Sequence, residues 1–162
     1  YPALEKGVID AAEFVGPLDD EKLGLFKVAK YYYAPGWWEG GASLGLFINR
    51  KAWAALPPLY QVAMRTAAAE ANQWLTVKYD TENPQALRRL VAGGAQLRSF
   101  PKDVTQASYT AANELFDEMS AKSPAFKKIF AHWSKFRAEQ VMWQQFCDLP
   151  FDNMMSGLLR KK

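Results

Sequence analysis

The stretch of sequence that decides the fold runs from residue 31 to residue 41 and reads Tyr31-Tyr32-Tyr33-Ala34-Pro35-Gly36-Trp37-Trp38-Glu39-Gly40-Gly41. It places five aromatic residues and one acid beside four Pro or Gly residues that interrupt regular structure. Because tandem Trp side chains are costly to leave in water, we expect Trp37 and Trp38 to wall a cleft for a small ligand, with Glu39 at its edge. The alternative is a core-forming turn whose glutamate faces solvent, and the spacing alone leaves both open.

The composition describes one globular domain of ordinary size. The chain has 162 residues, of which 49% are hydrophobic and 14% aromatic, so overall disorder is excluded. The net charge is only +3, and Lys and Arg cluster nowhere except at the terminal 160–162, so nucleic acid is not expected as a partner. The single Cys147 excludes an internal disulfide, and no apolar run reaches the roughly 18 residues of a membrane helix.

The pattern predicts short strands first and long helices afterwards. Strands are expected at residues 8–12, 31–33, 43–49 and 96–100, with 43–49 the best candidate. Helices are expected at residues 3–7 (ending at Gly7), from Pro17, from the cap Asn49 through Leu56, from Pro58 for about seven turns, from Asp103 to about Lys122, and after Ser123. Pro84 is expected to break or kink the longest helix, and Gly93-Gly94 to end it.

Two acids near the start of the chain are candidates for chemistry. Asp10 and Glu13 follow the first expected strand, and acids in this position of an open α/β sheet commonly face the ligand crevice. Glu13 could bind a hard cation or accept a hydroxyl hydrogen bond, whereas Asp10 is interpreted as a cap of a neighbouring helix. Glu13 and Glu39 together would form a two-carboxylate cation site or, in the rival interpretation, the acid pair of a hydrolase.

No complete catalytic set accompanies these acids. His132, the only histidine, has no convincing nucleophile or orienting acid nearby and is interpreted as a packing or surface residue. Cys147 has no basic residue within four positions to activate its thiol and is interpreted as a small apolar residue. The pattern therefore favours a binding protein over an enzyme, and a module of interacting helices is a third possibility.

The order of the motifs resembles one known family. Ala3-Leu4-Glu5-Lys6-Gly7-Val8-Ile9-Asp10-Ala11-Ala12-Glu13-Phe14 is similar to a passage of the periplasmic solute-binding proteins of TRAP (tripartite ATP-independent periplasmic) transporters, the DctP family. Residues 32–39 and 46–53 resemble the next blocks in the same order. The resemblance covers essentially the whole chain and is strongest to the subgroup that binds 2-oxo acids or lactate with a metal ion.

The resemblance implies a fold, a site and partners. The fold would be the α/β, C-terminal part of a two-lobed periplasmic-binding-protein fold, with residues 1–49 forming cleft strands and turns of both lobes, 50–122 a long connecting helix, strand and helix, and 123–162 a C-terminal helix. Glu13, Phe14 and Glu39 would hold a sodium or calcium ion that bridges to the substrate carboxylate. Phe14, Glu39, Trp37 and Trp38 would contact the substrate, and the last two are our own inference.

The resemblance also implies a transport role outside the cytoplasm. The protein would be a periplasmic, non-enzymatic component that delivers a small organic acid, such as pyruvate or lactate, to a membrane permease. The arginine that pairs with the substrate carboxylate in this family has no counterpart among these residues. The aromatic residues Phe130, Trp133, Phe136 and Trp143 fit a homodimer contact of the C-terminal helix, and equally a contact with an N-terminal lobe that precedes Tyr1.

Overall fold

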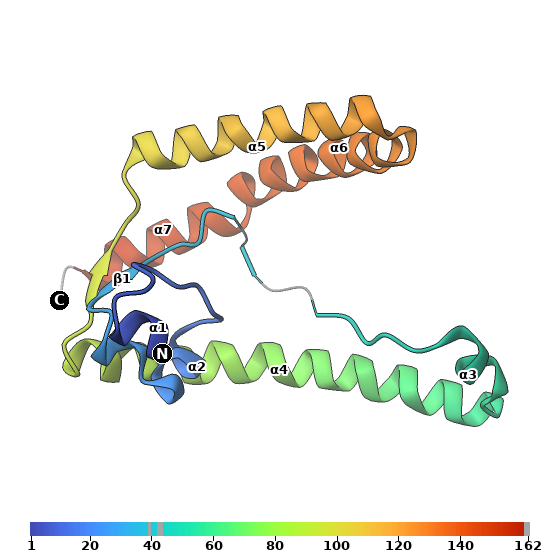
Figure 1. Ribbon diagram of the computed structural model, residues 1–162, viewed down its shortest axis with the longest axis horizontal. Coiled ribbons are helices and arrows are strands. Elements are labelled where there is room, and N and C mark those ends of the chain that lie inside the picture. Colours follow the sequence, from blue (N-terminus) through green and yellow to red (C-terminus); the bar gives the residue numbers. More distant parts are fainter. Residues whose placement is uncertain (39, 42–43, 161–162) are drawn as a thin grey trace. The chain divides into compact units, whose positions relative to one another are not determined.

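The computed structural model describes residues 1–38, 40–41 and 44–160 (Figure 1). The chain divides into two compact units, Tyr1–Pro101 and Lys102–Lys162. Both consist mainly of helices, and the strands are short, as the sequence predicts. The assignment of residues 1–49, 50–122 and 123–162 to parts of a two-lobed protein stays a prediction. Along the described residues no helix combines the length and the apolar character needed to cross a membrane.

The first unit is built around one long helix and one short parallel strand pair. Its elements are α1 (Pro2–Glu5), α2 (Pro17–Leu23), the 3-10 turn η1 (Leu25–Lys27), β1 (Tyr31–Tyr33), α3 (Arg50–Ala55), α4 (Pro58–Ala92) and β2 (Gln96–Arg98). The strands pair in parallel, with Tyr32 opposite Leu97. Helix α2 packs on the C-terminal half of α4, and the buried residues of the unit are Leu18, Asp20, Ala86, Leu90 and Ala95.

Several local signals in the first unit act as the sequence predicts. Gly7 follows α1 with φ of +65°, the left-handed conformation that a glycine adopts at low cost. The side chain of Asn49 accepts hydrogen bonds from the backbone N–H groups of Lys51 (2.9 Å) and Ala52 (3.2 Å), and thereby caps α3. Helix α4 ends at Ala92, directly before Gly93. These positions confirm the expected helix boundaries.

Pro84 was expected to break or kink the long helix, and the structure shows that it does not break it. Helix α4 runs without interruption for 35 residues from Pro58 to Ala92 and carries Pro84 inside it. Proline removes one backbone donor, so the carbonyl four residues earlier, that of Asp80, loses its helical partner. Asp80 and Pro84 are both exposed, so water can pair that carbonyl. The helical turns on both sides of Pro84 then keep the helix continuous.

Two predicted strands are wrong. Residues 8–12 and the described part of 43–49, residues 44–49, form no strand, and Phe47 in the second segment is 95% exposed. A strand needs a neighbour to pair its backbone N–H and C=O groups. Among the described residues the only strand pairing joins β1 to β2, so neither apolar segment has a strand beside it. The apolar residues of both segments are compatible with strands, but a strand forms only where its backbone finds a partner.

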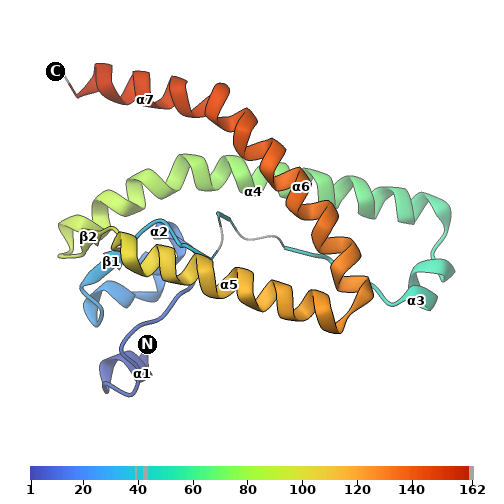
Figure 2. The same cartoon turned by 90° about the horizontal axis from the view of Figure 1, so that it is seen from above.

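The second unit is a helical hairpin followed by a third helix (Figure 2). It contains α5 (Lys102–Lys122), α6 (Pro124–Phe146) and α7 (Asp148–Leu159). Ser123 lies at the turn between α5 and α6, where its hydroxyl accepts a hydrogen bond from the backbone N–H of Phe126 at 3.2 Å. An aromatic cluster joins the two helices and consists of Phe116, Phe126, Phe130 and Trp133. The expected terminal helix is thus two helices, separated at Cys147.

Candidate ligand-binding site

A cavity of about 740 Å³ lies in the first unit, between the segment that follows α1 and the chain around β1. Among the described residues, its lining includes the acids Asp10, Glu13 and Asp20 and a single cationic side chain, that of Lys30. The aromatic part of the lining consists of Phe14, Tyr31, Tyr32, Tyr33 and Trp38. A cavity with large aromatic walls and a few polar groups suits a small ligand. Because carboxylates outnumber cationic side chains in this lining, the cavity favours a bound cation.

The structure brings three of the predicted site residues to this cavity. Glu13, Phe14 and Trp38 all line it. Trp37 is not part of the lining, but its ring meets that of Trp38 edge to face, with 5.3 Å between centroids. Glu39 lies outside the described residues, so its distance from Glu13 is not part of the structure.

An aromatic group anchors the predicted tryptophan wall. The ring centroid of Trp38 lies 6.1 Å from that of Phe100, which in turn lies 5.0 Å from that of Tyr33. Phe100 follows β2 and Tyr33 ends β1, so the wall forms where both strands of the parallel pair end. Aromatic pairs at these separations gain contact energy beyond simple burial. The wall therefore depends on β2 as well as on its own loop.

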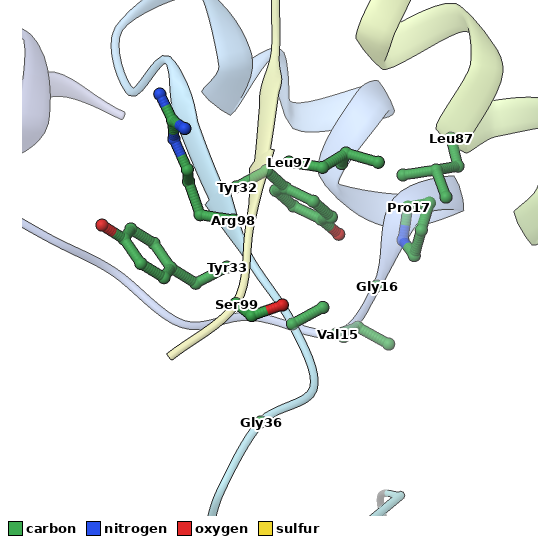
Figure 3. A pocket seen from close by; sticks show the side chains of 11 residues that line it. Val15, Gly16, Pro17, Tyr32, Tyr33, Gly36, Leu87, Leu97, Arg98 and Ser99 are labelled. Atoms are coloured by element: carbon green, nitrogen blue, oxygen red, sulfur yellow. The ribbon is translucent and has the colours of Figure 1, made fainter. Parts of the chain in front are cut away.

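A second cavity of about 430 Å³ adjoins the first (Figure 3). Its lining is mostly apolar and includes Pro17, Leu87 and Leu97. Tyr32 lines both cavities, together with Val15, Gly16, Tyr33 and Gly36. The Tyr32 side chain is therefore part of the wall between the two spaces.

Asp20 and Tyr32 form a polar contact at this wall that sequence reasoning missed. The Tyr32 hydroxyl donates a hydrogen bond of 2.5 Å to Oδ2 of Asp20, and Asp20 is only 8% exposed. Burial, together with the adjacent Asp20 carboxylate, holds the pKa of Tyr32 well above its ordinary value, so Tyr32 remains a donor. The sequence indicated Asp20 only as an acid near a helix N-terminus, and its pairing across the chain required the fold.

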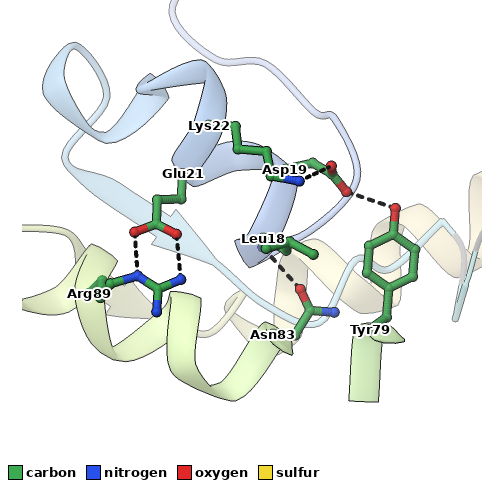
Figure 4. Close-up of polar contacts among 7 residues, drawn as sticks. All are labelled: Leu18, Asp19, Glu21, Lys22, Tyr79, Asn83 and Arg89. Atoms are coloured by element: carbon green, nitrogen blue, oxygen red, sulfur yellow. Dashed lines mark hydrogen bonds and ion pairs between the residues drawn. The ribbon is translucent and has the colours of Figure 1, made fainter. Parts of the chain in front are cut away.

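Helix α2 carries Asp20 and is tied to α4 by three polar contacts (Figure 4). The Arg89 guanidinium donates two hydrogen bonds to the Glu21 carboxylate, at 2.6 and 2.8 Å. The Tyr79 hydroxyl donates to Asp19 at 2.7 Å, and the backbone N–H of Leu18 donates to Oδ1 of Asn83 at 3.0 Å. These contacts fix the helix that holds the carboxylate of Asp20.

The described residues fit part of a hard-cation site. Sodium and calcium prefer oxygen ligands, and the acids Asp10 and Glu13 are among the residues that line the cavity. Calcium takes about six to eight such oxygens. Within residues 1–38, 40–41 and 44–160, no three His, Cys, Asp or Glu side chains converge closely enough to form a metal cluster. The two carboxylates have the right chemistry for such a cation and supply part of its ligand set.

The remaining candidate residues take no part in the cavity. His132 lies on α6 with its side chain exposed. Partial burial and a hydrogen bond to Asp148 raise the pKa of the Cys147 thiol above its ordinary value. A raised pKa disfavours the thiolate and therefore nucleophilic reactivity. His132 is therefore a surface residue, one of the two interpretations that the sequence left open, and Cys147 is half-buried.

Comparison with known proteins agrees with a ligand-binding cleft. Residues 1–123 match the family described as bacterial extracellular solute-binding protein, family 7 (DctP). The class of protein that this match defines is that of the bacterial extracellular solute-binding proteins. The chain belongs to this family.

Named relatives bind small carboxylates. The monocarboxylate 2-oxoacid-binding periplasmic protein of Nostoc sp. (strain PCC 7120) is 44% identical over 157 residues, which are 97% of this chain and 43% of that protein. A TRAP transporter solute-binding protein from Bordetella bronchiseptica RB50 matches with a TM-score of 0.94 and 49% identity, over 100% of this chain and 48% of that protein. Its crystal structure is a mixed-occupancy dimer, with copurified calcium and picolinate in one site and the other site apo.

A further solved structure has a different cation. The TRAP periplasmic solute-binding protein from Pseudoalteromonas atlantica T6c matches with a TM-score of 0.79 and 30% identity, and contains sodium and pyruvate. The match covers 93% of this chain and 46% of that protein. The present chain therefore spans less than half the length of each relative named here.

Proposed function

We propose that this chain is the C-terminal portion of a TRAP transporter solute-binding protein that captures a small monocarboxylate, a 2-oxo or 2-hydroxy acid, with a bound metal ion. The observation that carries the proposal is the cavity in which Glu13, Phe14 and Trp38 meet, in a chain that belongs to family 7. Relatives that bind pyruvate with sodium, or picolinate with calcium, support both the ligand class and the cation.

Each lining residue has a role that its chemistry supports. The Glu13 carboxylate would hold the cation, and the backbone carbonyl of Phe14 would add a second oxygen. A bound sodium or calcium ion would supply positive charge against which the ligand carboxylate is oriented. The Trp38 ring, backed by Trp37, would cover the apolar part of the ligand and exclude water. Glu39 completes the proposed site as a metal or ligand contact. No bond is made or broken in this scheme.

The proposed protein works outside the cytoplasm and with partners. The family is described as extracellular and the Nostoc relative as periplasmic, which supports a periplasmic location. A TRAP membrane permease would receive the ligand. The Bordetella dimer supports a homodimer of this protein, and α6 leaves Phe136 and Trp143 each 55% exposed. These two side chains are our candidates for the dimer contact.

Calorimetric titration of the full-length protein tests the proposal. Pyruvate, lactate and picolinate are titrated into chelator-treated protein, and again after sodium or calcium is restored. We expect binding that requires the cation. Glu13→Gln should weaken it by about tenfold or more, because a charged oxygen ligand is lost.

A matched variant controls for charge. Glu70→Gln makes the same chemical change at an exposed position of α4 that lines no described cavity. Its affinity should stay within about twofold of the unmodified protein, as is typical of a surface substitution. Equal affinities for both variants would remove Glu13 from the site. Absence of binding for every acid in the panel, with either cation, would contradict the proposed function.

A further inference from the structure

The Asp20 carboxylate is buried, and removing a carboxylate from water costs free energy. One of its oxygens, Oδ2, accepts the Tyr32 hydrogen bond at 2.5 Å. The other, Oδ1, is buried and has no hydrogen-bond partner among the residues that the structure describes. An apolar side chain of similar size would avoid the cost of removing a carboxylate from water. The contact with Tyr32 therefore needs a reason other than packing.

The element that this contact holds is short. Strand β1 has three residues, and the described sheet contains one partner strand, β2. The parallel ladder is extended by one bond at each end, from Gln96 N–H to the Lys30 carbonyl (2.7 Å) and from Ala34 N–H to the Arg98 carbonyl (3.0 Å). A pair of short strands is marginal by itself. The Tyr32 hydroxyl ties β1 to a second element, α2.

Helix α2, which carries Asp20, is itself held in place by contacts with α4. Its contacts with α4 join Glu21 to Arg89, Asp19 to Tyr79 and Leu18 to Asn83. A continuous set of contacts therefore runs from the long helix through α2 and Asp20 to Tyr32. The segment that leaves β1 then leads within five residues to Trp38, which lines the larger cavity.

We propose that Asp20 is a positioning residue of the ligand site, which acts through Tyr32 to hold β1 and the tryptophan wall that follows it. The inference rests on the proposed function for its effect on ligand binding. Its structural part does not depend on that function, because the contact fixes the loop in the ligand-free protein as well. The hydrogen bond lies in a buried setting, where such a bond is electrostatically stronger than it would be in water.

Two matched tyrosine variants of the full-length protein test this role. Tyr32→Phe removes the hydroxyl that contacts Asp20. Tyr79→Phe removes a hydroxyl that contacts the neighbouring Asp19 on the same helix, but the Glu21–Arg89 and Leu18–Asn83 contacts still hold α2 on α4. Tyr79 also lines neither cavity. Amide hydrogen exchange without ligand should be faster in Tyr32→Phe than in Tyr79→Phe at residues 34 and 36–38. A merely structural role would accelerate exchange equally in both variants.

Calorimetry with pyruvate and calcium supplies the second readout. We expect Tyr32→Phe to bind about five- to tenfold more weakly, which corresponds to one strong hydrogen bond, and Tyr79→Phe to stay within about twofold. Asp20→Ala should match Tyr32→Phe, and the double variant should be no weaker than either, because both substitutions break one contact.

The outcomes separate this inference from the proposed function. Faster exchange at residues 34–38 in Tyr32→Phe alone, in a protein that binds no carboxylate, would support the positioning role and contradict the function. Carboxylate binding that is equal in both tyrosine variants, with equal exchange, would overturn the positioning role and leave the function intact. If Asp20→Ala does not fold, the tyrosine pair alone decides.

Discussion

At the scale of single residues, the cavity depends on close contacts that few substitutions can replace. Tyr32 donates its one hydroxyl hydrogen to Asp20, and Gly93 lets the Phe26 ring approach the end of α4. Loss of the Tyr32 hydroxyl would remove the contact between β1 and α2. A Cβ added at Gly93 would push the Phe26 ring away from the end of α4.

Gly93→Ala should destabilise the protein. A Cβ at this position would lie 2.7 Å from Cε2 of Phe26 and 3.3 Å from the Arg89 carbonyl oxygen, so the ring would have to shift. We expect a loss of about 1–3 kcal/mol in the free energy of unfolding, the usual cost of overpacking. Denaturant unfolding of the full-length protein measures it. Gly157→Ala, where a Cβ meets no described atom within 4 Å, is the control; an equal loss there would refute the steric argument.

Asn49→Ala should weaken the start of α3. Two backbone N–H groups, those of Lys51 and Ala52, lose their acceptor. Replacing such a cap by alanine typically costs about 1 kcal/mol. Asn49→Asp keeps an acceptor oxygen and should retain most of the stability. The same denaturant measurement compares the two variants, and identical stabilities would show that the cap contributes nothing.

At the scale of elements, the α2–α4 contact should depend on pH. The hydrogen bond from Arg89 lowers the pKa of Glu21 below its ordinary value of 4.5. A carboxyl group whose pKa is lower in the folded state stabilises the fold above its unfolded pKa, and that contribution is lost as the pH falls through the folded pKa. The contact should therefore stabilise the protein near neutral pH, at about pH 6 to 8, and should stabilise it less below about pH 4.5.

Arg89→Gln tests this pH dependence. The variant should be less stable than the unmodified protein near neutral pH, and the difference should shrink in acid and in high salt, because the pair is exposed. Arg88→Gln removes a neighbouring exposed arginine and should show no such trend. A stability difference for Arg89→Gln that stays constant from neutral to acid pH would contradict the assignment.

The helix ends could be predicted from the sequence, whereas the pairing of strands could not. Asn49, Gly93 and the Ser123 turn act within a few residues of themselves, so their local patterns located the helix ends correctly. The segments 8–12 and 44–49 have the composition of strands, but pairing depends on distant chain that a local pattern does not contain. Asp20 was missed for the same reason, because its partner Tyr32 lies across a turn from its helix.

The candidate site likewise contains residues that local motifs predict and features that depend on the fold. Glu13, Phe14 and Trp38 stand in recognisable motifs, and all three line one cavity. The second cavity is lined by residues of α4, β2 and β1, among them Leu87, Leu97 and Tyr32, which no single motif contains. The motifs therefore predicted residues that line the larger cavity, whereas the smaller one also needs residues of α4 and β2.

At the scale of the whole molecule, a cation that binds the folded state alone should raise its thermal stability. The expected gain is about 2.7 kcal/mol when calcium is present at about 100 times its dissociation constant. The melting temperature of the full-length protein should therefore rise with calcium concentration and return after chelation. Glu13→Gln should flatten this dependence and Glu70→Gln should keep it. A melting temperature that ignores calcium in the unmodified protein would contradict a bound cation.

The parallel pairing of β1 with β2 has a consequence for the order in which the protein is made. The strands are separated in sequence by all of α3 and α4. A ribosome releases the aromatic strand and its tryptophans long before the strand that completes the ladder. Pairings between such distant segments form slowly, and apolar segments that wait for a partner are prone to aggregate. Because the Trp38 ring packs against Phe100, which follows β2, the tryptophan wall cannot be completed before α4 and β2 have been made.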